Sequence, residues 1–468
     1  MCIRDRVNIK ILVDGMVQAG LLSADERAEF IESMTDEVAE LVLRTNVAQN
    51  VLLTTERARG VSFTEMFIRL MHWLEDTADL NRELEFLPSD SELRERAAQG
   101  QPLTGPELSV LTAYAKIQLS AALVDSDLAD DPWFHRTLSQ YFPAQIRERF
   151  DDKLDTHPLR REIIATVVAN QIINYGGIAF AYRVVDDSGS DLVDVARAFT
   201  VAMEIFELES YATRHAQLDA DVPLELWNRM SLRMRRLLDR VVRWFLHRQD
   251  TDSGIQELVE MYRPIVALRF GSQHLMGEES EERTQAEAEL AERHGVPRDL
   301  AVEWAELLDA FALLDVARLA QSQGITDVAT GGDGAASSSP DEAVTDENGV
   351  SVLMIARVYF ALFDRYGLEN LLNRISALPQ STRWENMARI AMREDLYSTL
   401  VALAAQALES PGEDAQQKVQ AWEQENADRL ERLREVLDEI ESMPGDDAGG
   451  ELAALSVALR TLRGALAG

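Results

Sequence analysis

The chain has 468 residues, of which 46% are hydrophobic and 27% charged, as is usual for a soluble globular protein. Its 81 acidic and 46 basic residues give a formal net charge of -35, which argues against binding to nucleic acid or to anionic membranes. The single cysteine, Cys2, excludes a disulfide framework, and the chain contains no run of about 18 apolar residues that would predict a membrane span. We therefore expect a cytoplasmic protein.

Residues 1–6 form the first distinct segment. They lack the apolar stretch of a secretory signal, and they do not read into the sequence that follows. We treat them as a candidate artefact of how the start of the chain was assigned.

Apolar residues recur at helical spacing along nearly the whole chain. Val38, Leu41 and Val42 stand at i, i+3 and i+4, and the run from Ile163 to Val168 repeats a similar face. Alternating patterns rich in β-branched residues, which would predict strands, are scarce. The sequence therefore predicts an all-α fold built from two or three helical segments.

Prolines and glycines punctuate these helical runs. The sequence from Thr104 to Glu107 predicts a helix cap before the run at residues 108–119. Gly176 and Gly177 predict the end of a helix that begins near Pro158.

Residues 324–349 break the pattern, because they contain the run TGGDGAASSSP followed by mostly acidic and small residues. Such a segment cannot bury enough apolar surface to offset the entropy of ordering it, so we predict a flexible linker. The linker separates a helical segment at residues 350–468 from two earlier ones, at residues 7–210 and 211–323.

No motif for a nucleotide or a catalytic nucleophile is present in the sequence. The chain has no G-x-G-x-x-G or Walker A loop, and no G-x-S-x-G turn. None of the seven histidines pairs with another at i, i+4, as zinc ligands on a helix would. We therefore assign no catalytic, cofactor-binding or metal-ligating residue.

His72, Glu75 and Asp76 share one face of a predicted helix. They could ligate a metal ion, or His72 could contact its acidic neighbours at the helix surface; we favour the surface contact. Adjacent acids such as Asp186 and Asp187 are expected on solvated faces in so acidic a chain.

Five arginines form a stripe along another predicted helix, at alternating spacings of four and three residues: Arg229, Arg233, Arg236, Arg240 and Arg243. The neighbouring apolar stripe consists of Met230, Met234, Leu237, Val241 and Trp244. The arginines could bind phosphates or RNA, or they could pair with acids of the same chain. Because acids are in large excess, we favour pairing within the chain.

Glu162, Thr166, Asn170 and Asn174 follow one another at four-residue intervals and so stack on one helix face. This polar seam either contacts another domain through hydrogen bonds or is satisfied within the helical bundle. We lean toward the second interpretation.

Several strings occur in a characteristic order: residues 7–12 (VNIKIL), 34–39 (MTDEVA), 41–43 (LVL), 103–111 (LTGPELSVL), 113–116 (AYAK), 141–143 (YFP) and 157–166 (HPLRREIIAT). This series resembles the C-terminal helical region of the large bacterial NAD-specific glutamate dehydrogenases. The resemblance is specific from residue 7 to about residue 210. It is looser toward the C-terminus, where Trp244 and Trp384 fall in weaker matches.

The resemblance implies a parent enzyme that oxidatively deaminates L-glutamate to 2-oxoglutarate and ammonia with NAD. In that family a lysine and an aspartate handle the amino acid, and a Rossmann unit binds NAD, all in a catalytic domain that precedes the helical region. Residues 3–6 depart from the family where the Rossmann unit should end, so these groups have no counterparts here. We expect this chain alone to be inactive and to bind no NAD.

The resemblance also implies a structural, assembly or regulatory role. The helices would pack on the family's catalytic domain and support a homo-oligomer, with the polar seam and the apolar residues at 7–13 as candidate contacts. An alternative is a free-standing helical scaffold that binds partner proteins without catalysis. A third hypothesis, nucleic-acid binding through the arginine stripe, is disfavoured by the net charge.

Overall fold

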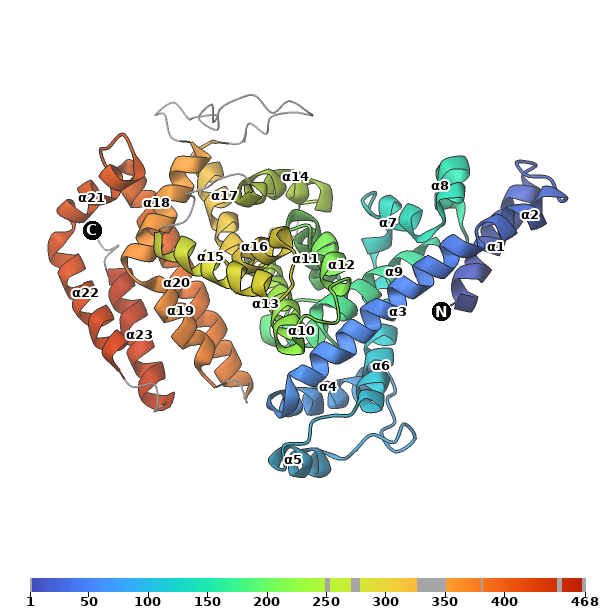
Figure 1. Cartoon of the computed structure of the whole chain (residues 1–468), viewed down its shortest axis with the longest axis horizontal. Helices are drawn as coiled ribbons and strands as arrows, with labels where there is room; N and C mark the ends of the chain where they lie inside the picture. The colour runs from blue at the N-terminus through green and yellow to red at the C-terminus, as the bar shows by residue number, and fades with distance from the viewer. Residues whose placement is uncertain are drawn as a thin grey trace. The chain divides into compact units, whose positions relative to one another are not determined.

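The computed structural model describes residues 2–248, 253–270, 278–325, 351–379, 382–443 and 448–464 (Figure 1). Every regular element within these ranges is a helix, which confirms the predicted all-α fold. The chain divides into two compact units, Met1–Leu258 and Val259–Gly468, and each is described here by itself. The predicted linker lies outside the described residues from position 326 onward.

The first unit contains the helices α1 (Cys2–Gln18), α2 (Glu26–Ser33), α3 (Thr35–Ala58), α4 (Thr64–Thr77), α5 (Asp90–Ala98), α6 (Gly105–Val124), α7 (Phe134–Tyr141), α8 (Ala144–Phe150), α9 (Arg160–Gln171), α10 (Phe180–Ser188), α11 (Leu192–Ile205), α12 (Leu208–Ala216) and α13 (Leu224–Arg248). Short 3-10 helices lie between some of them, and α9 continues as the π-helix η4 (Ile172–Gly176). The chain then passes into the second unit through α14 (Ile255–Val266).

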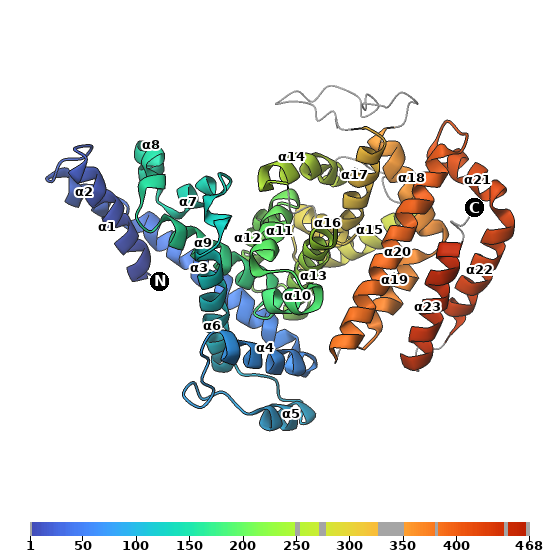
Figure 2. The same ribbon diagram turned by 180° about the vertical axis from the view of Figure 1, so that it is seen from behind.

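The second unit contains the helices α15 (Glu278–Arg293), α16 (Arg298–Glu306), α17 (Ala312–Ser322), α18 (Val352–Arg365), α19 (Leu368–Ala377), α20 (Arg383–Glu409), α21 (Ala415–Glu425), α22 (Ala427–Ser442) and α23 (Ala448–Gly464). Helices α15 and α16 pack together, α18 packs on α20 and α21, and α22 pairs with α23 (Figure 2). Trp304 and Trp422 are buried in this unit, and Arg283 bridges Asp309 and Glu369 at 3.0 and 2.8 Å.

Helix α6 begins at the predicted cap. The Thr104 hydroxyl accepts a hydrogen bond from the Glu107 N–H at 3.4 Å, and the Glu107 carboxylate accepts one from the Thr104 N–H at 2.7 Å. This reciprocal arrangement satisfies two N–H groups that have no partner inside the helix. The predicted cap is confirmed, and the helix runs on from it to Val124.

The helix that begins near Pro158 ends as predicted, at Gly176 and Gly177. Gly177 has a φ of +114°, a conformation that residues with a side chain rarely adopt. A Cβ at this position would lie 2.7 Å from the Glu56 Oε1. Glycine therefore allows the chain to turn closely over the buried Glu56 before α10 begins.

Helix α13 forms much of the core of the first unit. All members of its predicted apolar stripe, Met230, Met234, Leu237, Val241 and Trp244, are buried. The helix packs on α3, α10, α11 and α12. The segment boundary that we expected after residue 210 falls inside α12, whose Leu208 and Tyr211 are buried in this same core.

Within the described residues, no single helix has the length and apolar character needed to cross a membrane. Arg160–Gly176 and Phe180–Ser188 reach that threshold only when taken together, and they are bent by 87° at the break between them. Ile163, Ile164 and Phe180 of this pair are buried inside the first unit.

Candidate ligand-binding cleft in the first unit

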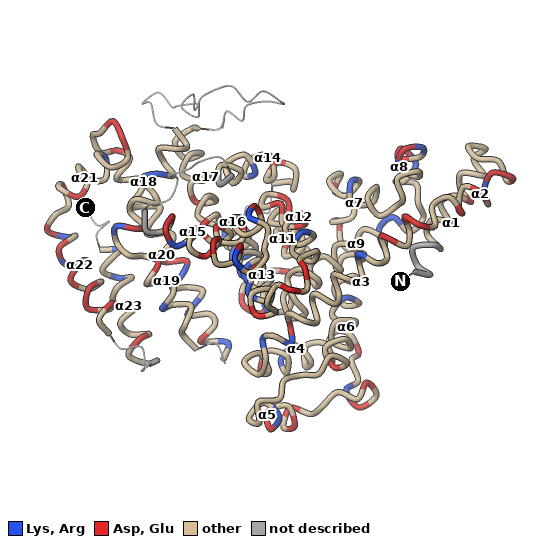
Figure 3. Tube along the Cα trace, in the orientation of Figure 1, with Lys and Arg blue, Asp and Glu red and all other residues tan. Residues whose placement is uncertain are grey.

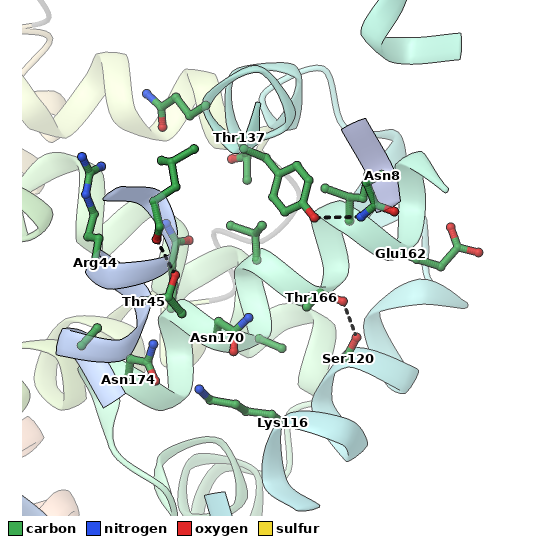
Figure 4. A pocket seen from close by; sticks show the side chains of 18 of the residues that line it. Asn8, Arg44, Thr45, Lys116, Ser120, Thr137, Glu162, Thr166, Asn170 and Asn174 are labelled. Atoms are coloured by element: carbon green, nitrogen blue, oxygen red, sulfur yellow. Dashed lines mark hydrogen bonds between the residues drawn. The ribbon is translucent and has the colours of Figure 1, made fainter. Parts of the chain in front are cut away.

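The first unit contains a cleft with a cavity volume of about 1730 Å³ (Figure 4). Its walls come from α1, α3, α6, α7 and α9 together with η4. Sites for small molecules commonly measure about 300–1,000 Å³, so a small ligand would fill only one part of this cleft.

The polar seam predicted from the sequence lines this cleft along its whole length. Glu162, Thr166, Asn170 and Asn174 all contribute to the wall. The Thr166 and Ser120 hydroxyls are 3.3 Å apart and share a hydrogen bond between α9 and α6. Asn174 is only 6% exposed, and its Oδ1 has no hydrogen-bond partner among the described residues. Within the polar seam, the Thr166 hydroxyl is thus hydrogen-bonded inside the bundle, whereas the Asn174 Oδ1 is left without a hydrogen-bond partner among the described residues.

Lys116 of α6 also lines the cleft, and the sequence analysis did not single it out. Its Nζ is buried and has no hydrogen-bond partner among the described residues. Burial lowers the pKa of this amine to about 8. The available signal was local, since Lys116 is the only basic residue of helix α6.

The wall formed by α3 presents Arg44, whose side chain is exposed. Tyr175 lines the same cleft; burial and the Glu209 carboxylate raise its pKa to about 12, while the Arg44 charge acts in the opposite direction. Tyr175 is therefore a neutral phenol throughout the physiological range, and it can donate a hydrogen bond into the cleft.

The end of the cleft near α1 is held by polar contacts between distant segments. The Asn8 side chain donates to the Tyr141 hydroxyl at 2.8 Å, and His157 Nε2 lies 3.1 Å from the Asn8 carbonyl oxygen. Burial lowers the pKa of His157, which keeps the imidazole neutral and suited to this contact.

The apolar residues at 7–13, which we expected as candidate contacts for another domain, are mostly used within the unit. Ile9, Leu12 and Val13 are buried. Val7 is 43% exposed and lines the cleft. Ile11 is half-buried, so Val7 is the most exposed apolar residue left for a contact through this stretch.

The arginine stripe lies on α13, and Figure 3 marks its basic positions along that helix. Arg243 is buried and pairs with Asp187 at 2.8 Å and with Asp239 at 3.3 Å. Arg229, Arg233 and Arg236 also interact with other residues of the chain. Pairing within the chain, the interpretation that we favoured, is confirmed for Arg243. The same contact shows that the expected solvated face is wrong for Asp187, whose side chain is only 4% exposed.

His72 makes the surface contact that we favoured over a metal site. Its Nδ1 lies 3.2 Å from Glu75, and its Nε2 lies 2.8 Å from Asp90 at the start of α5. Arg82 binds both of these carboxylates, at 2.9 and 2.6 Å. Throughout the part of the chain that the structure describes, no group of three or more His, Cys, Asp or Glu side chains has the arrangement of a metal site.

Comparison with known proteins assigns the chain to a family. Residues 100–464 match the family model described as glutamate dehydrogenase, C-terminal. The chain belongs to the glutamate dehydrogenase C-terminal family. Residues 1–56 match a second model, described as bacterial NAD-glutamate dehydrogenase, catalytic domain. The resemblance drawn from the ordered sequence strings is therefore confirmed.

Three curated relatives are named NAD-specific glutamate dehydrogenase. The chain is 35% identical to the protein of Mycobacterium tuberculosis over 99% of its own length, and 33% identical to that of Halomonas elongata over 97%. It is 31% identical to the protein of Pseudomonas aeruginosa over 95% of its length. The chain spans only 26–27% of the length of these relatives.

The two family models match residues on different walls of the cleft. The catalytic-domain model reaches residue 56, beyond residue 7, where the sequence alone placed the end of that domain. It covers α1, α2 and most of α3, whereas α6, α7 and α9 belong to the part matched by the C-terminal model. The cleft therefore has walls from both matched parts of the family.

Proposed function

We propose that the chain acts as the C-terminal helical part of an NAD-specific glutamate dehydrogenase. In this role it supports the catalytic domain and the assembly of a homo-oligomer, and it does not perform the reaction by itself. The parent reaction is the oxidative deamination of L-glutamate to 2-oxoglutarate and ammonia, with hydride passing to NAD. The catalytic domain of the parent holds the amino acid and the cofactor. We expect a cytoplasmic protein that binds neither nucleic acid nor membranes.

The alignment of nearly the whole chain with about a quarter of each relative carries this proposal. The packing of the first unit supports it. Glu56, the last residue matched by the catalytic-domain model, pairs with Arg235 of the C-terminal part at 2.7 Å. A buried contact of this kind ties the end of one matched part to the core of the other, as a supporting role requires.

The polar seam and Val7, which lies in the part matched by the catalytic-domain model, are the candidate contacts for the rest of the catalytic domain. Glu162 is exposed and Asn170 is half-buried, so both can reach a partner through the mouth of the cleft. Val7, at 43% exposure, adds an apolar group beside them. A mixed polar and apolar surface of this kind is usual at interfaces between domains.

An activity assay of the purified 468-residue chain tests whether it can catalyse the reaction without the rest of the parent enzyme. We expect no glutamate-dependent formation of NADH, followed by absorbance at 340 nm, and no binding of NAD by calorimetry, because no residue of this chain is assigned to hold substrate and nicotinamide together. NADH formation that requires both glutamate and the purified chain would overturn the proposal that catalysis resides elsewhere in the parent enzyme.

A further inference from the structure

We propose that the inner end of the cleft, formed by Lys116, Asn170 and Asn174, binds the carboxylate of a small organic acid. Lys116 comes from α6, and the two asparagines come from α9 and η4. Figure 4 shows the lysine amine directed toward the two carboxamide groups. The site goes beyond the proposed function, because support of a catalytic domain requires no ligand at this position.

The Lys116 amine lacks the counter-charge that a buried cation requires. Its Nζ is buried, and the described residues offer it no hydrogen-bond acceptor. Burial is the sole cause of its lowered pKa of about 8, since no described carboxylate acts on it. Burial of an unpaired ammonium group is costly, and an anionic ligand would remove that cost by supplying both the charge and the acceptors.

The two asparagines select the kind of anion. Their carboxamide NH2 groups donate hydrogen bonds but carry no charge. Asn174 is buried, and its Oδ1 has no hydrogen-bond partner among the described residues, so no bond at that oxygen prevents the carboxamide from turning its NH2 group toward an anion. One ammonium group with neutral donors balances a single negative charge. This balance matches a carboxylate better than a phosphate dianion.

The rest of the cleft has room for the body of such an acid. Arg44 of α3 lines the same cleft and forms no ion pair among the described residues. Arg44 adds a second basic group to the wall of the cleft, and its positive charge favours the entry of an anion.

Calorimetric titration of the 468-residue chain with succinate, acetate and inorganic phosphate tests the proposal. Succinate and acetate should both bind more tightly than phosphate. Lys116→Met should weaken the binding of succinate by about 10-fold or more, because it removes a charge-assisted hydrogen bond.

Two further variants keep the result interpretable. Lys153→Met is the matched control, because Lys153 is exposed and pairs with Asp152 outside the cleft, so binding should equal that of the unaltered chain. Asn170→Ala keeps the lysine and should weaken the binding of succinate several-fold. If circular dichroism shows that Lys116→Met does not fold, the Asn170→Ala result tests the proposed site in its place. The proposal is overturned if neither acid binds, if phosphate binds most tightly, or if Lys116→Met and Asn170→Ala bind succinate like the control.

Discussion

Glu56 of α3 and Arg235 of α13 form an ion pair at 2.7 Å, with side chains that are only 1% and 2% exposed. The Glu56 carboxylate also accepts a hydrogen bond from the Ile178 N–H at 3.3 Å and lies 3.7 Å from Arg59. Burial alone would raise the pKa of Glu56, but the charges of Arg59 and Arg235 lower it. The carboxylate is therefore ionised, and it joins three separate segments in the core of the first unit.

Replacing Glu56 should destabilise the first unit strongly. Glu56→Ala leaves Arg235 buried without its counter-charge, so we expect the free energy of unfolding to fall by about 3–5 kcal/mol. Urea denaturation followed by circular dichroism measures this change. Glu65→Ala is the control, because the pair of Glu65 with Arg94 is exposed and should contribute about 1 kcal/mol or less. Equal losses in the two variants would show that the buried pair contributes little.

Gly177 should tolerate no side chain. Gly177→Ala forces a Cβ to within 2.7 Å of the Glu56 Oε1 at a φ of +114°, so we expect a loss of about 1–3 kcal/mol in the free energy of unfolding. Gly15→Ala is the matched control, since Gly15 lies inside α1 with open space around it and should gain about 0.5–1 kcal/mol. A stabilised Gly177→Ala protein would contradict the close turn over Glu56.

Lys116 should make stability rise with pH in the alkaline range. The folded chain has a pKa of about 8 at this amine, against an ordinary value of 10.5. Between these values the folded chain has released the proton that the unfolded chain still binds, so stability rises from about pH 8 to pH 10.5. Lys116→Met should be more stable than the unaltered chain at pH 7, by up to about 3 kcal/mol. This advantage should shrink as the pH rises through that range, and an advantage independent of pH would contradict the burial of the charged amine.

His215 should make stability fall in acid. Its Nε2 lies 2.9 Å from the Trp227 carbonyl oxygen, and burial lowers its pKa to about 4, from an ordinary value of 6.5. As the pH falls from 6.5 toward 4, the unfolded chain gains a proton that the folded chain does not bind, so stability is lost over this window. His215→Gln should remove up to about 2 kcal/mol of that dependence between pH 7 and pH 5, measured by urea denaturation at the two pH values. An unchanged pH slope in this variant would contradict a neutral buried imidazole.

Local patterns in the sequence predicted the helices well. The cap at Thr104, the stop at Gly176 and Gly177, and the apolar stripe of α13 all follow from hydrogen-bonding and spacing rules that act within a few residues. The polar seam was also visible, because four-residue spacing defines one helix face.

The cleft itself could not be predicted, because it depends on contacts between residues far apart in the chain. Nothing near Lys116 in the sequence shows that its amine is directed toward Asn170 and Asn174. The burial of Asp187 likewise depends on Arg243, 56 positions away. The sequence pattern also could not show that the catalytic-domain match extends to residue 56, because α3 has the same helical periodicity as the helices that follow it.

Removal of the matched region from a relative tests the supporting role most directly. The part of the Mycobacterium tuberculosis NAD-specific glutamate dehydrogenase that aligns with residues 100–464 of this chain would be deleted in one variant and replaced by those residues in another, so that the part matched by the catalytic-domain model stays in place. Glutamate-dependent NADH formation and native mass would then be measured for both variants and for the intact enzyme. We predict that the deletion loses activity and assembly and that the replacement restores them. A deletion variant with the activity and native assembly of the intact enzyme would contradict the account.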